Sequence, residues 1–383
     1  MIKRTLQELC LNITDGKHGD CENEENSGYY FISCKDIFDG QINYKNARQI
    51  TKADFEETHK RTMLEVDDIL LTNSGTIGRM AFVTDREATT KTTFQKSVAI
   101  IKPDKQKVLP RYLYYQLQNC VPQFINSSNG SAQKNLLLST MRTFQIEIEE
   151  NREKQEKIAN TLSAYDDLIE NNQKQIKLLE EAARRLYKEW FVDLHFPGYE
   201  NTKIVDGVPE GWIKEKIGKI IKKVHRTKQI VASEYKDEGS IPIVDQSRAF
   251  VAGYTNDLEA RVDFGIPIIV FGDHTRIVKL IQFPFAKGAD GTQLIISDCL
   301  EMPQRLLYCS IMNIDLSNYH YARHFKYLKE EKIMIPTVKV ANEFENNVTG
   351  IFSKIQNCRD EIIRCQKTRD LLLPKLMSGE VEV

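Results

Sequence analysis

The sequence predicts an α+β protein in which two similar mixed α/β domains are joined by two long helices. The helices are expected to pair as an antiparallel coiled coil, with pseudo-twofold symmetry. Three observations carry this prediction. Apolar residues recur in alternating steps of four and three over 158–190, the same stepping recurs over 344–376, and strand-like runs precede each stretch. Such spacing puts the apolar residues on the helix face that a coiled coil buries.

The first helical stretch carries ten positions on this seam. Asn172, near its middle, is the polar exception, and a polar residue there fixes the register of a helix pair at some cost in stability. The seam positions are Ile158, Leu162, Tyr165, Ile169, Asn172, Ile176, Leu179, Ala183, Leu186 and Trp190.

The second stretch repeats the seam, each position lying 186 residues after its counterpart and without a gap. This agreement indicates an internal duplication whose helices pack on each other; the alternative is two unrelated amphipathic helices, each packed on its own domain. Arg369 is the charged exception, and Pro374 is expected to distort or end the last turn. The positions are Phe344, Val348, Ile351, Ile355, Cys358, Ile362, Cys365, Arg369, Leu372 and Leu376.

A segment with short apolar runs and turn residues, typical of a mixed α/β domain, precedes each helix. The first contains predicted strands within 28–38, 67–83, 94–103 and 144–148 and a helix over 110–125. The second repeats this order, with strands within 240–246, 265–283, 292–298 and 331–338 and a helix over 303–313. The chain is therefore divided into a first domain, a first helix, a second domain, and a second helix with its tail, over residues 1–150, 151–195, 196–340 and 341–383.

The composition is that of an ordinary globular chain, with 41% hydrophobic and 28% charged residues and a net charge of −1. No overall basic field exists, so a nucleic-acid partner has to be attracted by local patches. One such patch is the stretch 214–228, where seven Lys and Arg stand against one Glu. Its apolar spacing predicts an amphipathic helix with the basic face outward, which either contacts a DNA backbone or is only a solvated face.

The chain lacks the features of a membrane or secreted protein. No apolar run is long enough to span a bilayer, and the N-terminus has no secretory apolar core. Eight cysteines are scattered without a CxxC pair, which argues against structural zinc and favours free thiols. We therefore expect a cytoplasmic protein.

Catalytic motifs are missing from the sequence. It contains no GxxxxGK[ST], GxGxxG or HExxH pattern and no Pro-Pro dipeptide. Two Glu-x-Lys triplets, at 234–236 and 330–332, are interpreted as solvated surface. We therefore expect no catalytic residue, no cofactor and no bound metal.

Six segments resemble the DNA-specificity subunit of type I restriction–modification enzymes, and the resemblance covers nearly the whole chain. "LLLPKLMSGEV" resembles the C-terminal signature of that family, and "EKQEKIANTLSAYDDLIENNQKQIKLLEE" resembles its central helix. The others are similar to parts of its target-recognition domains: "TDGKHGD" with "FISCKDIFDGQI", "VPEGWIKEKIGKI", and "FGDHTRIVKLIQFPFAKGADGTQLI", at residues 14–20 with 31–42, 208–220, and 271–295.

This resemblance implies a subunit without catalysis of its own, in which each recognition domain reads one half of a bipartite double-stranded DNA target. It implies that the helical coil sets the spacer between the halves and docks two adenine-specific methyltransferase (M) subunits. ATP-driven translocase and nuclease (R) subunits then complete the restriction enzyme. Two other functions stay open: a structural coiled-coil adaptor with protein-binding heads, and an autonomous DNA nuclease or methyltransferase with unrecognised motifs.

Polar loops are the candidate DNA contacts, because Arg, Asn and Gln side chains suit base edges, whereas Lys and small hydroxyls suit phosphates. The alternative is that these are ordinary solvent loops. The first domain offers Asn73, Ser74, Thr76, Arg79, Lys91, Gln95, Asn129, Ser131, Gln133, Lys134 and Asn135. The second offers Gln246, Arg248, His274, Thr275, Arg276, Lys287, Thr292, Tyr321, Arg323 and His324.

Overall fold

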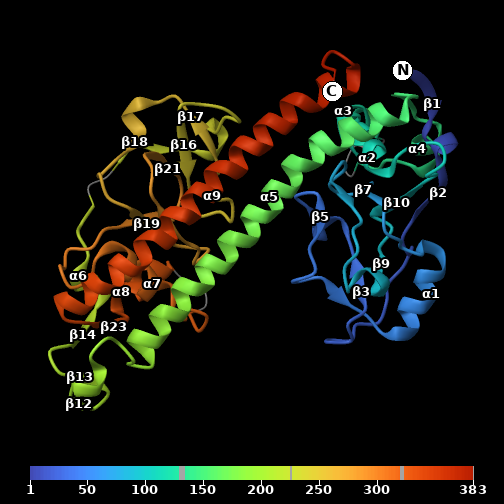
Figure 1. The fold of residues 1–383 in the computed structure, drawn as a ribbon. Helices are drawn as coiled ribbons and strands as arrows, with labels where there is room; N and C mark the ends of the chain where they lie inside the picture. Colours follow the sequence, from blue (N-terminus) through green and yellow to red (C-terminus); the bar gives the residue numbers. More distant parts are fainter. Residues whose placement is uncertain (129–133, 225–226, 320–322, 383) are drawn as a thin grey trace. The chain divides into compact units, whose positions relative to one another are not determined.

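A computed structural model describes residues 1–128, 134–224, 227–319 and 323–382, and it forms two compact units. Unit 1 comprises Met1–Glu170 together with Ile363–Val383, and unit 2 comprises Asn171–Ile362. Both units mix helices and strands, and two long helices are present, so the predicted fold class is confirmed (Figure 1).

The two long helices are α5, Arg152–Tyr187, and α9, Val338–Ser378. A π-helical turn, Lys188–Val192, extends α5. The prediction that Pro374 could end the helix is wrong, because α9 continues past Pro374 to Ser378. Proline removes only the hydrogen bond to the carbonyl of Asp370, and Asp370 is exposed, so water can donate to that carbonyl instead.

Within unit 1, the start of α5 packs antiparallel against the end of α9. Leu162 and Leu376 belong to one buried core, and Asp166 accepts a 2.6 Å hydrogen bond from the Arg369 guanidinium. The hydroxyl of Tyr115, from helix α2 (Pro110–Asn119), donates to the second oxygen of Asp166 at 2.5 Å. Arg369, the charged residue on the predicted seam, is therefore paired with Asp166, and this carboxylate also connects α5 to α2 by a hydrogen bond.

Within unit 2, the end of α5 packs antiparallel against the start of α9. Glu180 of α5 pairs with Arg359 of α9 at 2.9 Å, and the rings of Trp190 and Phe344 lie 5.7 Å apart. A later residue of the first helix contacts an earlier residue of α9, so the two helices run antiparallel.

Unit 1 contains an antiparallel sheet with the strand order β2-β10-β7-β8, and a smaller sheet with the order β6-β3-β9 in which β3 and β9 are parallel. The first strand also pairs with the strand that leads into α5, as β1-β11. The strands are β1 Ile2–Thr5, β2 Cys10–Asp15, β3 Tyr30–Ile32, β4 Ile37–Phe38, β5 Gln41–Ile42, β6 Arg48–Gln49, β7 Ile69–Thr72, β8 Met80–Phe82, β9 Thr92–Phe94, β10 Val98–Pro103 and β11 Gln145–Ile148.

Unit 2 repeats this plan. Strand β14 pairs with β23, which leads into α9; β19 lies between β20 and β22; and β16 lies between the antiparallel β17 and the parallel β21. The repeated pairings support the predicted duplication. The strands are β12 Ile204–Val205, β13 Val208–Pro209, β14 Ile213–Lys216, β15 Gln229–Ile230, β16 Ile241–Val244, β17 Gly253–Thr255, β18 Arg261–Val262, β19 Ile268–Gly272, β20 Val278–Ile281, β21 Phe285–Gly288, β22 Thr292–Ile295 and β23 Lys332–Ile335.

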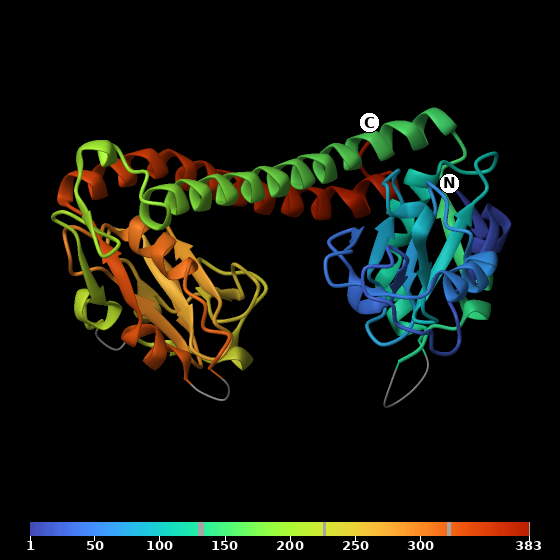
Figure 2. The ribbon, with the colours of Figure 1, turned by 90° about the horizontal axis from the view of Figure 1, so that it is seen from below.

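The shorter helices cover the sheets of their own units. In unit 1 they are α1 Lys52–Thr62, α2 Pro110–Asn119, α3 Val121–Asn126 and α4 Leu138–Thr143, and in unit 2 they are α6 Ile217–Ile220, α7 Gln304–Met312 and α8 His324–Glu330. Figure 2 shows the sheets of each unit lying to one side of that unit's portions of α5 and α9.

The predicted amphipathic helix over 214–228 is wrong. Residues Ile213–Lys216 form β14, which pairs with β23 at every position, and within the described residues of this stretch only Ile217–Ile220 is helical. Strand pairing satisfies the backbone here, while Ile217 and Ile220 enter the core from the short helix.

Each unit has buried strands at its centre, and these account for the apolar runs in the sequence. All four residues of β7 and all five of β19 are buried, because helices or loops cover both faces. The helices of the described ranges include none with the length and apolar character that a membrane span requires.

Candidate nucleic-acid interface

Four segments of unit 1 meet where the parallel strands β3 and β9 end. The amide of Asn73, after β7, donates to the carbonyl of Ser97 at 3.0 Å, and the amide of Leu136 donates to the carbonyl of Asn73 at 2.8 Å. The amide of Lys17, after β2, donates to the carbonyl of Phe94 at 2.8 Å. We call this meeting point the unit 1 loop junction.

Unit 2 builds the same junction from equivalent residues. The amide of Asp273, after β19, donates to the carbonyl of Gly291 at 2.8 Å, and the amide of His324 donates to the carbonyl of Asp273 at 2.9 Å. The parallel strands β16 and β21 end beside it, at Val244 and Gly288. The carboxyl ends of parallel strands are the usual place for ligand sites in such sheets, so both junctions are positioned to bind a partner.

Glycine makes this close approach of the loops possible. A side chain on Gly272 would place its first carbon 2.2 Å from Oγ1 of Thr275 and 2.9 Å from the side chain of Gln246. In unit 1, a side chain on Gly16 would meet the backbone carbonyl of Phe94 at 2.0 Å. Any larger residue at either position would push the junction apart.

In unit 1 the structure brings most of the described candidate residues to the junction. Thr76, Arg79, Lys91, Lys134 and Asn135 are exposed, while Ser74 and Gln95 are half-buried. A β-bridge joins Ser74 to Asn135. The remaining candidates of this domain, Asn129, Ser131 and Gln133, lie outside the described residues.

In unit 2 the exposed candidates are Arg248, His274, Thr275, Arg276 and Arg323, and Lys287 is half-buried. Two of them also make contacts within the protein. The Thr275 hydroxyl donates to the carbonyl of Gln246 at 2.7 Å, and the Arg276 guanidinium donates to the carbonyl of Leu316 at 3.0 Å. Tyr321 lies outside the described residues.

Gln246 is occupied at both ends of its amide. Its NH₂ group donates to the carbonyl of Asp290 at 2.8 Å, and its oxygen accepts from the amide of His274 at 3.0 Å. Reading an adenine requires both ends of the amide to face the base. The structure therefore places Gln246 as a bridge between loops.

Three candidates are buried and carry a polar atom without a partner in the described structure. They are Asn73 and Thr292, at 4% and 1% exposed, and His324, at 7%; the atoms are Oδ1, Oγ1 and Nδ1. Burial lowers the pKa of His324, and nearby Arg276 lowers it further, so the ring is neutral near pH 7. Buried polar groups are normally hydrogen-bonded, so these atoms need a water or a partner atom.

A basic groove of about 900 Å³ lies beside the unit 2 junction. Its lining includes Lys223, Lys287, Arg323 and Lys329, with Asp290 as a carboxylate. Within the described ranges, Lys223, Lys287 and Lys329 form no ion pair. Burial lowers the pKa of Lys287, and the nearby Asp290 carboxylate opposes this shift. A groove of this charge suits the phosphates of a nucleic-acid backbone.

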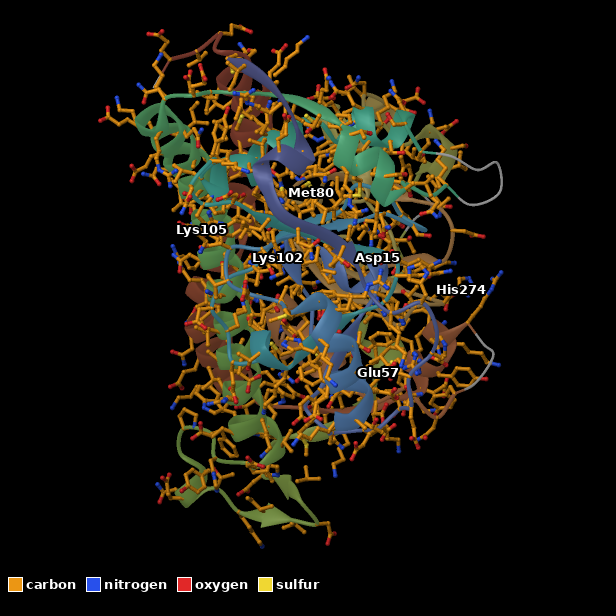
Figure 3. All side chains as sticks on the ribbon, turned by 90° about the vertical axis from the view of Figure 1, so that its right-hand side faces the viewer. Asp15, Glu57, Met80, Lys102, Lys105 and His274 are labelled. Atoms are coloured by element: carbon orange, nitrogen blue, oxygen red, sulfur yellow. The ribbon has the colours of Figure 1, made fainter. Side chains whose placement is uncertain are left out.

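The equivalent segment of unit 1, residues 14–20, has its charges neutralised internally. Lys17 lies 3.1 Å from Asp54 and 3.2 Å from Glu57 of α1, and hydrogen bonding to Asp54 raises the pKa of Lys17. Asp15 pairs with Arg61 and, at 3.0 Å, with His18. Figure 3 shows Asp15 on β2 and Glu57 on α1, on the same side of the unit.

The predicted coil residues are all buried or half-buried. Those below 9% exposed are Ile158, Leu162, Ile169, Asn172, Phe344, Val348, Ile355, Cys358 and Cys365. The half-buried ones are Tyr165, Ile176, Leu179, Leu186, Ile351, Ile362 and Leu372.

Sequence reasoning missed two kinds of residue at the site. Lys329 lines the basic groove but was not considered, whereas Lys222 was included only as part of the basic stretch 214–228, which was predicted as a helix. Lys279, inside β20, is 5% exposed and supports the loop after β16. A lysine within an apolar strand, "IVKLI", was the available signal, because an unpaired buried lysine is unfavourable.

The histidine-rich end of unit 2 does not form a metal site in the described part of the chain, where no three His, Cys, Asp or Glu side chains gather closely enough to hold an ion.

The architecture is that of a duplicated protein. Each mixed α/β unit gathers its polar loops at the ends of parallel strands, and two long helices pair within each unit. A family model described as the type I restriction modification DNA specificity domain matches residues 3–181. The MjaIX type I restriction enzyme specificity subunit of Methanocaldococcus jannaschii is 29% identical over 387 residues, which cover 92% of this chain and 87% of that protein. The EcoBI specificity subunit of Escherichia coli is 28% identical over 173 residues, covering 44% and 35%.

Among solved structures, the type I restriction–modification S subunit from M. genitalium aligns with a TM-score of 0.58 and 16% identity, covering 98% of this chain and 95% of that one. This likeness concerns the fold. The family model assigns residues 3–181 to the type I restriction modification DNA specificity domain, and the MjaIX relative makes the chain similar to a type I restriction enzyme specificity subunit over nearly its whole length.

Proposed function

We propose that each unit reads one half of a bipartite duplex DNA target, and that α5 and α9 set the spacer between the halves. The observation that carries the proposal is the loop junction, which the two units build with the same backbone hydrogen bonds. A duplicated junction of polar loops suits two half-sites better than one continuous site. We assign base reading to the exposed guanidinium groups of Arg79, Arg248 and Arg323 and to the side-chain amide of Asn135.

The chain acts within a complex that contains DNA and other subunits. In this proposal the coil docks two methyltransferase subunits, translocase and nuclease subunits join them, and the chain itself is not catalytic. The eight free cysteines suit a reducing, cytoplasmic setting.

Methylation of a random duplex pool by the chain and a type I methyltransferase tests this function. We expect adenine methylation to concentrate on one motif of two short halves separated by a fixed gap. The methyltransferase alone is the control and should select no motif. A pool methylated without any sequence preference would refute the proposal and favour a structural adaptor.

The basic groove gives a prediction about salt. Phosphate contacts make the affinity for DNA fall with salt concentration, with a slope of about 0.9 for each neutralised phosphate. We expect the triple substitution Lys223→Gln, Lys287→Gln and Lys329→Gln to reduce this slope by about 2 to 3. Fluorescence anisotropy with a labelled random duplex, over a salt series, measures it.

The matched control removes the same charge from lysines that are already paired: Lys3 with Glu147, Lys105 with Asp67, and Lys188 with Asp193. Changing these three to glutamine should leave the slope unchanged. An equal loss of slope in both triple variants would show that net charge, and not the groove, controls binding.

A further inference from the structure

We propose that Arg359 of α9 and Lys279 of β20 are positioning residues that hold loop 245–250 in shape, so that residues remote from DNA determine the recognition of one half-site. The inference rests on the proposed function and deepens it, because it names what sets the specificity of the unit 2 junction. All the residues involved belong to unit 2.

Lys279 contacts both ends of this loop. Its ammonium group donates to the carbonyl of Asp245 at 2.8 Å and to the carbonyl of Ala249, at the two ends of the loop. The Asp245 carboxylate lies 3.9 Å away and accepts from the amide of Ser247 at 2.9 Å. Burial lowers the pKa of Lys279 to about 8, because the ammonium group loses its solvation, and the Asp245 carboxylate offsets part of this effect.

Arg359 holds the far end of the loop through Phe250. The guanidinium carbon lies 3.8 Å from the centre of the Phe250 ring, at cation–π distance, and the guanidinium also pairs with Glu180 at 2.9 Å. The Phe250 ring also lies edge to face with Phe283 at 6.0 Å, and both rings pack on a buried core cluster of the sheets. Phe250 is therefore fixed between the sheets and the helix pair.

The loop in turn positions the rest of the junction. Gln246 bridges to Asp290 and His274, and its carbonyl accepts from Thr275, so three loops share one hydrogen-bonded residue. Arg248 lies exposed in the middle of the loop, between the two anchors. A shift of Phe250 therefore has to move Arg248 or break the Gln246 bridge.

Neither positioning residue is itself available to read a base. Lys279 is 5% exposed, and the Arg359 side chain is 19% exposed with its charge directed at Glu180. An effect of either residue on sequence preference has to pass through the loop. Misplacement of contact groups by about 1 Å is enough to change recognition by one or two orders of magnitude.

The test uses Arg359→Met, which removes the charge and keeps most of the side-chain volume, and Arg359→Lys, which keeps the charge and loses the planar fork. The matched control is Arg305→Met. Arg305 is similarly buried and pairs with Glu345 of α9 at 2.9 Å, but no contact joins it to loop 245–250 within the described ranges.

Two measurements separate positioning from stability. Hydrogen exchange of the full chain should show faster exchange of amides 246–250 in Arg359→Met than in Arg305→Met. Methylation of the random pool with the methyltransferase should lose about tenfold in discrimination at one or more positions of a single half-site, with the other half unchanged. Arg359→Lys should give a smaller loss in the same half.

Either of two results overturns the inference: unchanged half-site preferences with unchanged loop exchange in both Arg359 variants, or the same motif change in Arg305→Met. If the wild-type complex selects no motif at all, the proposed function fails; the exchange measurement still reports whether Arg359 orders the loop.

Discussion

Replacing Phe344 by alanine is expected to lower the free energy of unfolding of unit 2 by about 3 to 5 kcal/mol. Phe344 is 0% exposed at the start of α9. Its ring lies 5.1 Å from Phe191, 5.7 Å from Trp190 and 6.3 Å from Tyr187, each in an edge-to-face arrangement. Alanine would leave a cavity in this cluster and remove three aromatic contacts at once.

Denaturant unfolding followed by tryptophan fluorescence measures this change, because both tryptophans, Trp190 and Trp212, are buried in the same core. Leu178→Ala is the control. Leu178 lies on α5 with 71% of its surface exposed, so its loss should change stability by no more than about 0.5 kcal/mol. A cost below about 1 kcal/mol for Phe344→Ala would mean that the aromatic cluster does not hold the helix pair to unit 2.

Inserting four residues after Glu170 in α5 is expected to lengthen the spacer of the DNA target by one to two base pairs without changing either half-site. Four residues add about 6 Å to a helix, and a base pair adds about 3.4 Å. Because four residues are close to one turn, the seam beyond the insertion is rotated by only about 40° and can still pack. Methylation of the random pool gives both the gap and the half-sites.

The control places the same four residues after Gly207, in the turn between β12 and β13 and outside both helices. That insertion should leave the gap unchanged. The spacer role of the helices is wrong if the α5 insertion alters the sequence of a half-site, or if it leaves the gap as it was.

The helices and central strands were predictable because their signals are local. A seam repeats every seven residues, so a short stretch of sequence reveals it. The two seams agree in phase at a separation of 186 residues, and this agreement predicted the duplication. Strands such as β7 and β19 have both faces covered and therefore appear as continuous apolar runs. The prediction for strand β14 was wrong, because two of its residues "IKEK" are exposed and two half-buried, and its pairing partner β23 lies far along the chain.

The candidate interface was predictable as a set of loops but not in the role of each residue. Asn73, Gln246 and Thr292 have side chains suited to DNA, yet the structure buries two of them and occupies the amide of Gln246. Their roles depend on which loops meet at the ends of parallel strands, and that is a property of the fold. Arg359 could not be assigned from sequence for the same reason, since Phe250 lies more than a hundred residues before it.

Unit 1 is made from both ends of the chain, and this has a consequence for how the protein is synthesised. Leu376 and Met377, buried at 1% and 2% exposure, complete a core that otherwise comes from the first 162 residues. At about 5 to 20 residues per second, a ribosome needs roughly 10 to 40 seconds to make the 192 residues between Glu170 and Ile363. During that interval the N-terminal part of the chain has an apolar surface that Leu376 and Met377 do not yet cover.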